Sequence, residues 1–376
     1  MKNRLFAGTV IVALTAMGAV PASSQELPDT MVWTAYGVGS TGYSEASAFA
    51  DAFGKKYGTR VRIQPSGSGV GRLQPLLQGR ADYAFLGTEA FFVSEGTYDF
   101  ATKDWGPTEL RAVAGRPAST TLVAAGDAGI KTVADAKGKR IAFIAGNPSI
   151  NAKCEAILAF GGLTLDDVEA ITFPTYSSAM SSMTRNEADA TCTQPTTSEL
   201  YELAESPRGI YYVPLEVDNK EGWDRLLKVL PIMAPSQETI AAGLAEGEVA
   251  RMAAYRYPVI AATADKSADD VYAFIKALDE TYDLYKDSTA VMPRWKLDSS
   301  AKPPIDLPFH EGAIRYLTEI GLWTDEDETW NQKRTERLNS LVAAWKEFNP
   351  QHADLSEEDF AAAWMDRRAE IVAGLE

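Results

Sequence analysis

The fold is decided by a stretch near the start of the chain, which reads VWTAYGVGSTG at residues 32–42, VRIQPSGSG at 61–69 and YAFL at 83–86. Each segment begins as a short strand, and the first two strands run into a glycine-rich turn. Helical spacing of apolar residues follows each turn, at Ala46, Phe49, Ala50 and Phe53 and then at Leu73, Leu76 and Leu77. This order of strand, helix and strand predicts a parallel sheet with right-handed crossovers. We expect Gly54 to end or weaken the first helix.

The same pattern restarts in the middle of the chain. It predicts strands at 140–144, 170–173 and 190–193, helices at 152–160 and near 177–184, and a turn at 146–149. The extended segment 120–125 separates the two units, so the sequence predicts two α/β lobes. A returning strand at 257–263 and a helix at 268–281 follow, and residues 311–376 have a nearly continuous helical pattern.

Composition excludes several classes of protein. The 376 residues include 36 Lys and Arg against 52 Asp and Glu, which gives a formal net charge of -16. Such an acidic chain repels nucleic-acid phosphates and anionic membrane surfaces, so we expect no nucleic-acid partner. Two His and two Cys exclude most His-rich or Cys-rich metal sites, and no metal is expected.

The first residues predict export. A basic start at residues 1–4, an apolar run at 5–20 and the small residues Ala22, Ser23 and Ser24 are the three parts of a cleavable signal peptide covering residues 1–24. The apolar run is short for a bilayer core of about 30 Å, which disfavours a membrane anchor. We therefore predict a periplasmic protein. In that oxidising compartment Cys154 and Cys192 either pair or remain two buried thiols.

Three turns of one kind carry the chemistry, at residues 39–42, 66–69 and 146–149. Each joins a strand to a helix, and a helix N-terminus offers unpaired N–H groups and a positive dipole end to an anion. Ordinary helix capping also explains each turn taken singly. In an open α/β sheet, however, such turns share the edge where ligands bind. Three of them in one chain therefore favour a cleft for an anion.

Nucleotide and catalytic sites are poorly supported. Residues 37–42 fit G-x-G-x-x-G, but the second strand ends in Gln64-Pro65-Ser66 where a dinucleotide site needs an acidic residue. His310 and His352 lie far along the chain from the turns, which disfavours a Ser–His catalytic pair. We therefore expect no cofactor and no enzyme, although a periplasmic hydrolase using the same cleft is a third hypothesis.

Five short motifs carry a family resemblance. They are GSTG at 39–42, SGSGVGRL at 66–73 followed by LLQGRAD at 76–82, VADAKGKRI at 133–141, NEADA at 186–190 and PFHEGAIRY at 308–316. Because these motifs occur in the family's order, the chain from about Trp33 to Leu322 resembles the extracytoplasmic solute receptors of TRAP transporters, in the TAXI subfamily. The ligand-facing turns depart from the family pattern at Tyr43-Ser44-Glu45 and at residues 147–150.

The resemblance implies a type II periplasmic-binding-protein fold, which has two lobes that are each a mostly parallel sheet flanked by helices. We expect residues 25–121 with 257–325 to form lobe 1 and residues 122–256 to form lobe 2. Residues 326–376 would form a C-terminal helical extension, to which no function is assigned.

The resemblance also implies a function. The monomeric protein would capture a small anionic organic solute (a dicarboxylate, a keto acid or an acidic amino acid such as glutamate) by lobe closure and deliver it to a TRAP transporter. The alternative is an ABC-importer receptor for an oxyanion or organic acid. Glu45 and Glu89 are expected to be surface carboxylates, and either would hold an ammonium if the solute is an amino acid. For Arg72 the sequence leaves two roles open, a charged partner of the solute or a solvated residue on a helix face. The predicted ligand-binding residues are Gly39, Ser40, Thr41, Tyr43, Ser66, Ser68, Arg72, Thr88, Asn147, Ser149, Asn151, Thr193 and Gln194.

Overall fold

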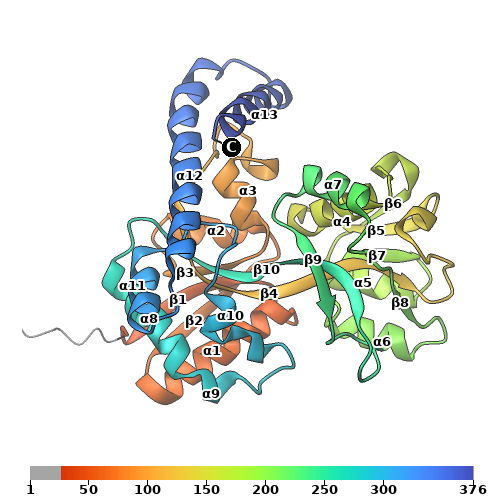
Figure 1. Ribbon diagram of the computed structural model, residues 1–376, viewed down its shortest axis with the longest axis horizontal. Helices are drawn as coiled ribbons and strands as arrows, with labels where there is room; N and C mark the ends of the chain where they lie inside the picture. The colour runs from red at the N-terminus through yellow and green to blue at the C-terminus, as the bar shows by residue number, and fades with distance from the viewer. Residues whose placement is uncertain (1–26, 376) are drawn as a thin grey trace, which may run out of the picture.

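The computed structural model describes residues 27–375 and shows two lobes side by side, with a helical hairpin above the first (Figure 1). The predicted export signal lies outside the described residues. The described strands are β1 (Thr30–Ala35), β2 (Arg60–Pro65), β3 (Tyr83–Leu86), β4 (Leu110–Ala125), β5 (Arg140–Ile144), β6 (Glu169–Phe173), β7 (Ala190–Thr193), β8 (Ile210–Tyr212), β9 (Ala234–Glu238) and β10 (Ala250–Thr263).

Helices cover both lobes. They are α1 (Thr41–Tyr57), α2 (Gly69–Leu77), α3 (Glu89–Glu95), α4 (Pro148–Phe160), α5 (Tyr176–Thr184), α6 (Ser198–Glu205), α7 (Lys220–Val229), α8 (Ala268–Glu280), α9 (Tyr282–Tyr285), α10 (Leu297–Ser300), α11 (Glu311–Glu319), α12 (Asp325–Gln351) and α13 (Glu357–Ala373). Short 3-10 helices lie at Tyr98–Phe100, Val133–Ala136, Leu165–Asp167 and Met292–Trp295. Within residues 27–375, no helix combines the length and the apolar character that a membrane crossing requires.

Each lobe contains a mostly parallel sheet. In the first lobe, β1 pairs in parallel with β2 and β3, and β10 lies antiparallel to β3. In the second, β5 pairs in parallel with β6 and β7, and β4 lies antiparallel to β7 and β8. The predicted fold class, two α/β lobes with a helical extension, is confirmed.

Two long antiparallel strands, β4 and β10, connect the lobes across the middle of the molecule (Figure 1). Their pairing runs from Ala253 opposite Thr120 in the middle to Thr263 opposite Leu110, with an irregularity between Arg256 and Val259. Strand β4 starts ten residues before the extended segment expected at 120–125, because its first half belongs to the sheet of the first lobe. The lobe boundaries proposed from sequence fall within these two strands and stay a prediction.

Helix α1 is longer than expected. It continues through Gly54 to Tyr57 and ends at Gly58, which has a φ of 75° and donates its N–H to the Gly54 carbonyl. Glycine inside a helix costs about 1 kcal/mol relative to alanine. Burial of the neighbouring Phe49 and Phe53 offsets that cost, since both side chains are fully buried. Of the two effects expected of Gly54, ending the helix is therefore wrong, and weakening it stays a prediction.

An aromatic core holds the first lobe together and positions its two ligand-side turns. The fully buried Trp33 of β1 lies 5.6 Å from Phe53, 5.6 Å from Phe85 and 5.5 Å from Phe274, measured between ring centroids. These rings come from α1, β3 and α8, so one indole joins the sheet to helices on its faces. The contacts with Phe53 and Phe274 are edge-to-face, and such aromatic pairs stabilise a core by about 0.5–1.5 kcal/mol each beyond the area they bury.

In the second lobe, a disulfide joins Cys154 of α4 to Cys192 of β7. The bond connects the helix that follows the third turn to the central strand of its sheet. Of the two states that the sequence allowed for these cysteines, the structure has the paired one. Cys192 also lines the cavity between the lobes described below.

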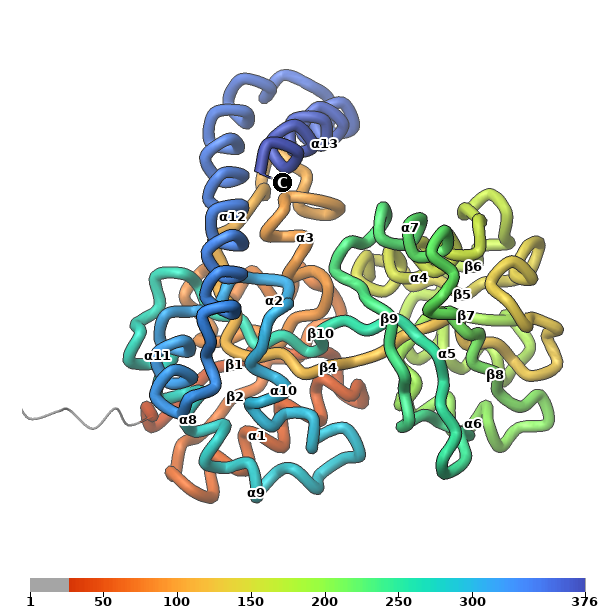
Figure 2. Tube along the Cα trace, viewed as in Figure 1, coloured from red at the N-terminus to blue at the C-terminus, as the bar shows by residue number. Residues whose placement is uncertain are grey.

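The C-terminal extension is a hairpin of α12 and α13 that stands against α3 of the first lobe (Figure 2). Trp345, Phe348, Phe360 and Trp364 form its own small core. The buried carboxylate of Glu95, at the end of α3, accepts hydrogen bonds from three arginines of the hairpin. The shortest distances are 2.8 Å to Arg334, 2.7 Å to Arg337 and 2.5 Å to Arg368. The extension is therefore a packed part of the molecule.

Candidate functional site

A cavity of about 710 Å³ lies between the two lobes, and all three predicted turns line it. The β1–α1 turn contributes Gly39, Ser40 and Thr41, and the β2–α2 turn contributes Gly67 and Ser68. The β5–α4 turn of the other lobe contributes Asn147 and Ser149. The convergence follows from topology, because the carboxyl ends of parallel strands meet at one edge of each sheet.

Each turn also caps its helix. Ser40 accepts a hydrogen bond from the Tyr43 N–H at 3.2 Å, Ser68 from the Gly71 N–H at 3.1 Å and Asn147 from the Ile150 N–H at 3.3 Å. The capping role that the sequence left open is therefore present at all three turns. Capping and ligand contact coexist here, since a capped helix still has unpaired N–H groups in its first turn.

Eight of the thirteen predicted residues line the cavity: Gly39, Ser40, Thr41, Ser68, Asn147, Ser149, Thr193 and Gln194. Tyr43, Ser66, Arg72, Thr88 and Asn151 do not. Tyr43 packs partly buried against the core of the first lobe. Asn151 is held by strand β5, where its side chain bonds the N–H and the carbonyl of Ile144 at 3.1 and 2.9 Å. Thr88 is fully buried next to the cavity.

The expectation that Arg72 is a charged partner for the solute is not met. Its buried guanidinium binds the Glu89 carboxylate, at 3.1 Å from Nε and 2.5 Å from Nη2, and also donates to the Ser66 carbonyl at 2.8 Å. Burial tends to raise the pKa of Glu89, but the charge and hydrogen bonds of Arg72 lower it. Arg72 is therefore neutralised inside the first lobe and does not line the cavity.

The proposed ammonium-binding roles of Glu45 and Glu89 meet the same obstacle. Glu45 is fully buried and accepts hydrogen bonds from Arg116 Nε at 3.0 Å and Nη2 at 2.6 Å. The indole N–H of Trp295 donates to the same carboxylate at 2.6 Å. A buried carboxylate requires such partners to remain ionised. Both glutamates are paired with arginines inside the first lobe, and neither lines the cavity.

Lys153 is the charged cavity residue that the sequence reasoning missed. Its side chain is 4% exposed, and its Nζ donates to the Ser149 carbonyl at 2.7 Å and to the Ser149 hydroxyl at 3.1 Å. Burial lowers the pKa of this ammonium to about 8, although the nearby charges of Glu89 and Asp306 partly oppose the shift. Among the described lining residues, Lys153 is the only Lys or Arg. The sequence did contain a signal for this residue: Lys153 follows the predicted turn residue Ser149 by four positions, which places both on the same face of α4.

Four tyrosines form much of the cavity wall: Tyr36, Tyr176, Tyr255 and Tyr257. The rings of Tyr36 and Tyr257 lie 5.0 Å apart, and those of Tyr257 and Tyr255 lie 6.1 Å apart. Lys153 Nζ lies 4.5 Å from the centre of the Tyr255 ring. These three rings, called the tyrosine row below, therefore extend from the first turn to the ammonium group.

A direct hydrogen bond joins the lobes beside the cavity. The Thr88 N–H of the first lobe donates to the Ser149 hydroxyl of the second at 3.0 Å. Ser149 thus contacts both the opposite lobe and Lys153. On the second lobe, the Tyr176 hydroxyl bonds the hydroxyls of Thr193 and Thr197 at 2.7 and 2.6 Å. This geometry can surround a small solute with ring faces, hydroxyls and one cation.

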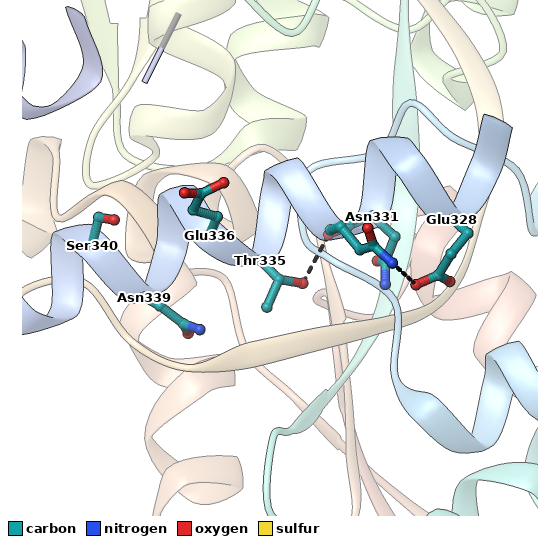
Figure 3. Close-up of a pocket in the computed structure, with 7 residues that line it drawn as sticks. Glu328, Asn331, Thr335, Glu336, Asn339 and Ser340 are labelled. Atoms are coloured by element: carbon teal, nitrogen blue, oxygen red, sulfur yellow. Dashed lines mark hydrogen bonds between the residues drawn. The ribbon is translucent and has the colours of Figure 1, made fainter. Parts of the chain in front are cut away.

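The groove along α12 offers a ligand less than the cavity between the lobes does. This shallow groove of about 530 Å³ follows α12 and is lined by polar side chains of that helix, some of which bond one another along it (Figure 3). There the Gln332 amide donates to Glu328 at 2.9 Å and the Thr335 hydroxyl to the Asn331 carbonyl at 2.8 Å. Within the part of the chain that the structure describes, no group of three His, Cys, Asp or Glu residues is placed to hold a metal ion.

Several solved structures are similar to this chain. The periplasmic aliphatic sulphonate binding protein of Escherichia coli is 18% identical over 71% of this chain and 74% of its own, with a TM-score of 0.43. An ancestral arginine-binding protein is 16% identical over 70% of this chain and 97% of its own, with a TM-score of 0.41. An amino acid ABC transporter substrate-binding protein of Streptococcus pneumoniae is 13% identical over 71% and 96%, with a TM-score of 0.40.

No curated protein matches the sequence significantly. A family model does match, and it spans residues 34–321. This range includes all three turns, both connecting strands and every residue that lines the cavity. It ends just before α12, so the helical hairpin lies outside it. The chain belongs to the NMT1-like family.

Proposed function

We propose that the protein is an exported solute-binding protein that captures a small anionic organic solute between its lobes. The observation that carries the proposal is the convergence of three strand–helix turns, two from one lobe and one from the other, on a single cavity. Helix N-termini and a buried ammonium both favour a negative charge at this place. The match to the NMT1-like family over residues 34–321 supports the same role, because that family is one of periplasmic solute-binding proteins.

Capture would work by closure of the lobes about strands β4 and β10. Closing excludes water from the cavity, and the hydrogen bonds of N–H groups, hydroxyls and Lys153 to an anion then strengthen in the lower dielectric. The bond from Thr88 to Ser149 supports this idea, because it joins the lobes beside the cavity. A local positive site is needed here, since the chain carries a formal net charge of -16.

After capture, the loaded protein would deliver the solute to a membrane transporter. The first candidate for that transporter is a TRAP-type secondary transporter. Its support is the five motifs that occur in the order of the TAXI receptors, between Gly39 and Tyr316. The second candidate is an ABC importer, because the NMT1-like family has the ABC-type substrate-binding fold. Uptake by the membrane subunits in vesicles separates the two. Dependence on an ion gradient supports the first, and dependence on ATP supports the second.

A thermal-shift screen tests the proposal. Dicarboxylates, keto acids, amino acids, aromatic carboxylates and phosphate would each be added to the purified protein. We expect a class of organic anions to raise the melting temperature through mass action and to be recovered chemically unchanged. Failure of every anion class, or turnover of the bound compound, would contradict the proposal.

A cavity-filling variant shows whether binding occurs at the predicted place. Gly67 lines the cavity, and a Cβ atom built on it meets no atom within 4 Å, so Gly67→Phe adds bulk to the cavity without a backbone clash. We expect this variant to lose the melting shift. Leu77→Phe is the matched control, because Leu77 ends helix α2, which follows the turn that contains Gly67, does not line the cavity and is 38% exposed. Equal shifts in the two variants would contradict the site.

A further inference from the structure

We infer that the captured solute is an aromatic monocarboxylate whose carboxylate binds Lys153 and whose ring lies along the tyrosine row of Tyr36, Tyr257 and Tyr255. This inference rests on the proposed function and narrows its broad class of organic anions to one kind. It differs from the dicarboxylates and acidic amino acids that the family resemblance implies.

The head-group site is a buried cation that no described carboxylate pairs with directly, although the charges of Glu89 and Asp306 act on it at longer range. Lys153 is 4% exposed, and its hydrogen bonds go to the neutral oxygens of Ser149. Among the described residues it forms no ion pair, whereas the buried Arg72 and Arg116 each bind a glutamate. Two of its three N–H donors are engaged, so one remains for a ligand. A solute carboxylate at this donor would neutralise the buried charge.

The apolar part of the solute would contact the aromatic rings of the tyrosine row. The Tyr36 hydroxyl is engaged by Glu89 at 3.2 Å, and Tyr255 forms a side-chain hydrogen bond with Gln194. These tyrosines therefore offer a solute mainly their faces and edges. The Arg72 guanidinium lies 3.8 Å from the centre of the Tyr36 ring and supports the row from within the first lobe. Aromatic rings pair favourably with such surfaces at centroid distances of about 4.5–7 Å.

The charges of the lining residues distinguish this class from a dicarboxylate, and the volume of the cavity leaves room for a ring. Lys153 is the only described cation lining the cavity, and the other charged lining residue is Glu199, which would repel a second carboxylate. The volume of about 710 Å³ lies well within the range of about 300–1,000 Å³ that is usual for drug-sized ligands. A single negative charge joined to a ring satisfies both observations.

Calorimetry on the full mature protein at pH 7 tests the inference, with benzoate and phenylacetate as probes and succinate and glutamate as comparisons. We expect the aromatic probes to bind at least tenfold more tightly than the dicarboxylates. Lys153→Met should weaken the aromatic probes by about tenfold or more, as loss of a charge-assisted hydrogen bond predicts. Lys266→Met is the matched control, since Lys266 also lies over a tyrosine ring, at 5.0 Å from that of Tyr83, but outside the cavity.

A second pair of variants tests the ring site independently of charge. Tyr255→Leu should weaken benzoate and phenylacetate but change the affinity for cyclohexanecarboxylate much less, because only the aromatic probes lose a ring–ring contact. Tyr272→Leu is the control, since that tyrosine pairs with Tyr316 away from the cavity. Circular dichroism melting confirms that each variant is folded before its affinity is interpreted.

The outcomes separate the two proposals. Tight binding of succinate or glutamate that Lys153→Met leaves unchanged would overturn this inference and leave the proposed function standing. Equal binding of benzoate to the wild type and Lys153→Met would also overturn it. If the protein binds no organic anion of any class, the proposed function fails, and the inference fails with it.

Discussion

Lys153 combines a stability cost with a place on the wall of the cavity. Desolvation of a buried ammonium lowers the pKa from 10.5 to about 8, which corresponds to about 3 kcal/mol of lost folding stability below pH 8. The charges that face it from packed elements are Glu89 of α3 and Asp306, both of which favour the protonated form, and Tyr255 of β10 lies beside it. A buried charge that is kept at such a cost is a common feature of binding sites.

We predict that Lys153→Met is more stable than the wild type in the absence of solute, by about 2 kcal/mol at pH 7, because the variant buries no charge. The difference should be constant below pH 8 and should shrink as the pH rises toward 10.5. In that window the unfolded lysine still holds its proton and the folded one has lost it, so the stability of the wild type rises with pH. Urea unfolding of both proteins at several pH values measures this, and a gap that does not change with pH would contradict it.

Single residues were the hardest features to predict from the sequence. Arg72 stands at the start of α2 beside a predicted turn, and nothing in its spacing shows that Glu89, seventeen residues later, neutralises it. Lys153 follows Ala152 and precedes Cys154, so it looks like one polar residue on an apolar helix. Whether a charged side chain is paired depends on residues from other elements, and those contacts exist only in the folded chain.

At the scale of elements, the hairpin of α12 and α13 depends on one buried carboxylate. Burial tends to raise the pKa of Glu95, but Arg334, Arg337 and Arg368 together outweigh burial and lower it to about 2. A carboxylate with a lowered pKa stabilises the folded state fully above its unfolded pKa of about 4.5. That contribution is lost as the pH falls from about 4.5 through 2.

We predict that Glu95→Gln destabilises the protein by about 3 kcal/mol at pH 7, because it removes the buried carboxylate that pairs with three half-buried arginines. Hydrogen exchange should rise mainly across residues 325–373, where the hairpin packs on α3. Glu347→Gln is the control, because Glu347 is an exposed residue of α12 that lines a separate groove between α12 and α13, and Glu95 does not line that groove. If the amides of residues 325–373 exchange equally fast in the two variants, Glu95 does not attach the hairpin to α3.

Local patterns predicted many elements closely and missed others. The strands at 83–86, 140–144 and 190–193 lie where the apolar runs placed them, and so do the three turns. Strands β8 and β9 were not predicted, because each is short or polar and is defined by its pairing with β4 or β10. The helical tail was predicted, but its attachment through Glu95 needed a contact across more than two hundred residues.

At the scale of the whole molecule, two sheets that share one strand order bring separate turns to one place. The convergence on the cavity was predictable, because strand polarity decides at which edge of a sheet the turns lie. The chemistry of the cavity was not predictable, since Tyr36 comes from the turn after β1, Tyr176 from α5 and Tyr255 from β10, and these tyrosines carry no motif. The fold and the location of the site therefore follow from local sequence patterns. The choice of side chains that line the site depends on tertiary contacts, which those patterns do not show.

The central claim is that the cavity between the lobes holds an organic anion against the turns of both lobes. A crystal structure of the protein with the best anion from the screen tests it most directly. The account predicts the solute between residues 39–41, 67–68 and 147–149, with its carboxylate within hydrogen-bond distance of Lys153. A solute bound outside this cavity, for example in the hollow beside Arg334 and Arg337, would contradict it.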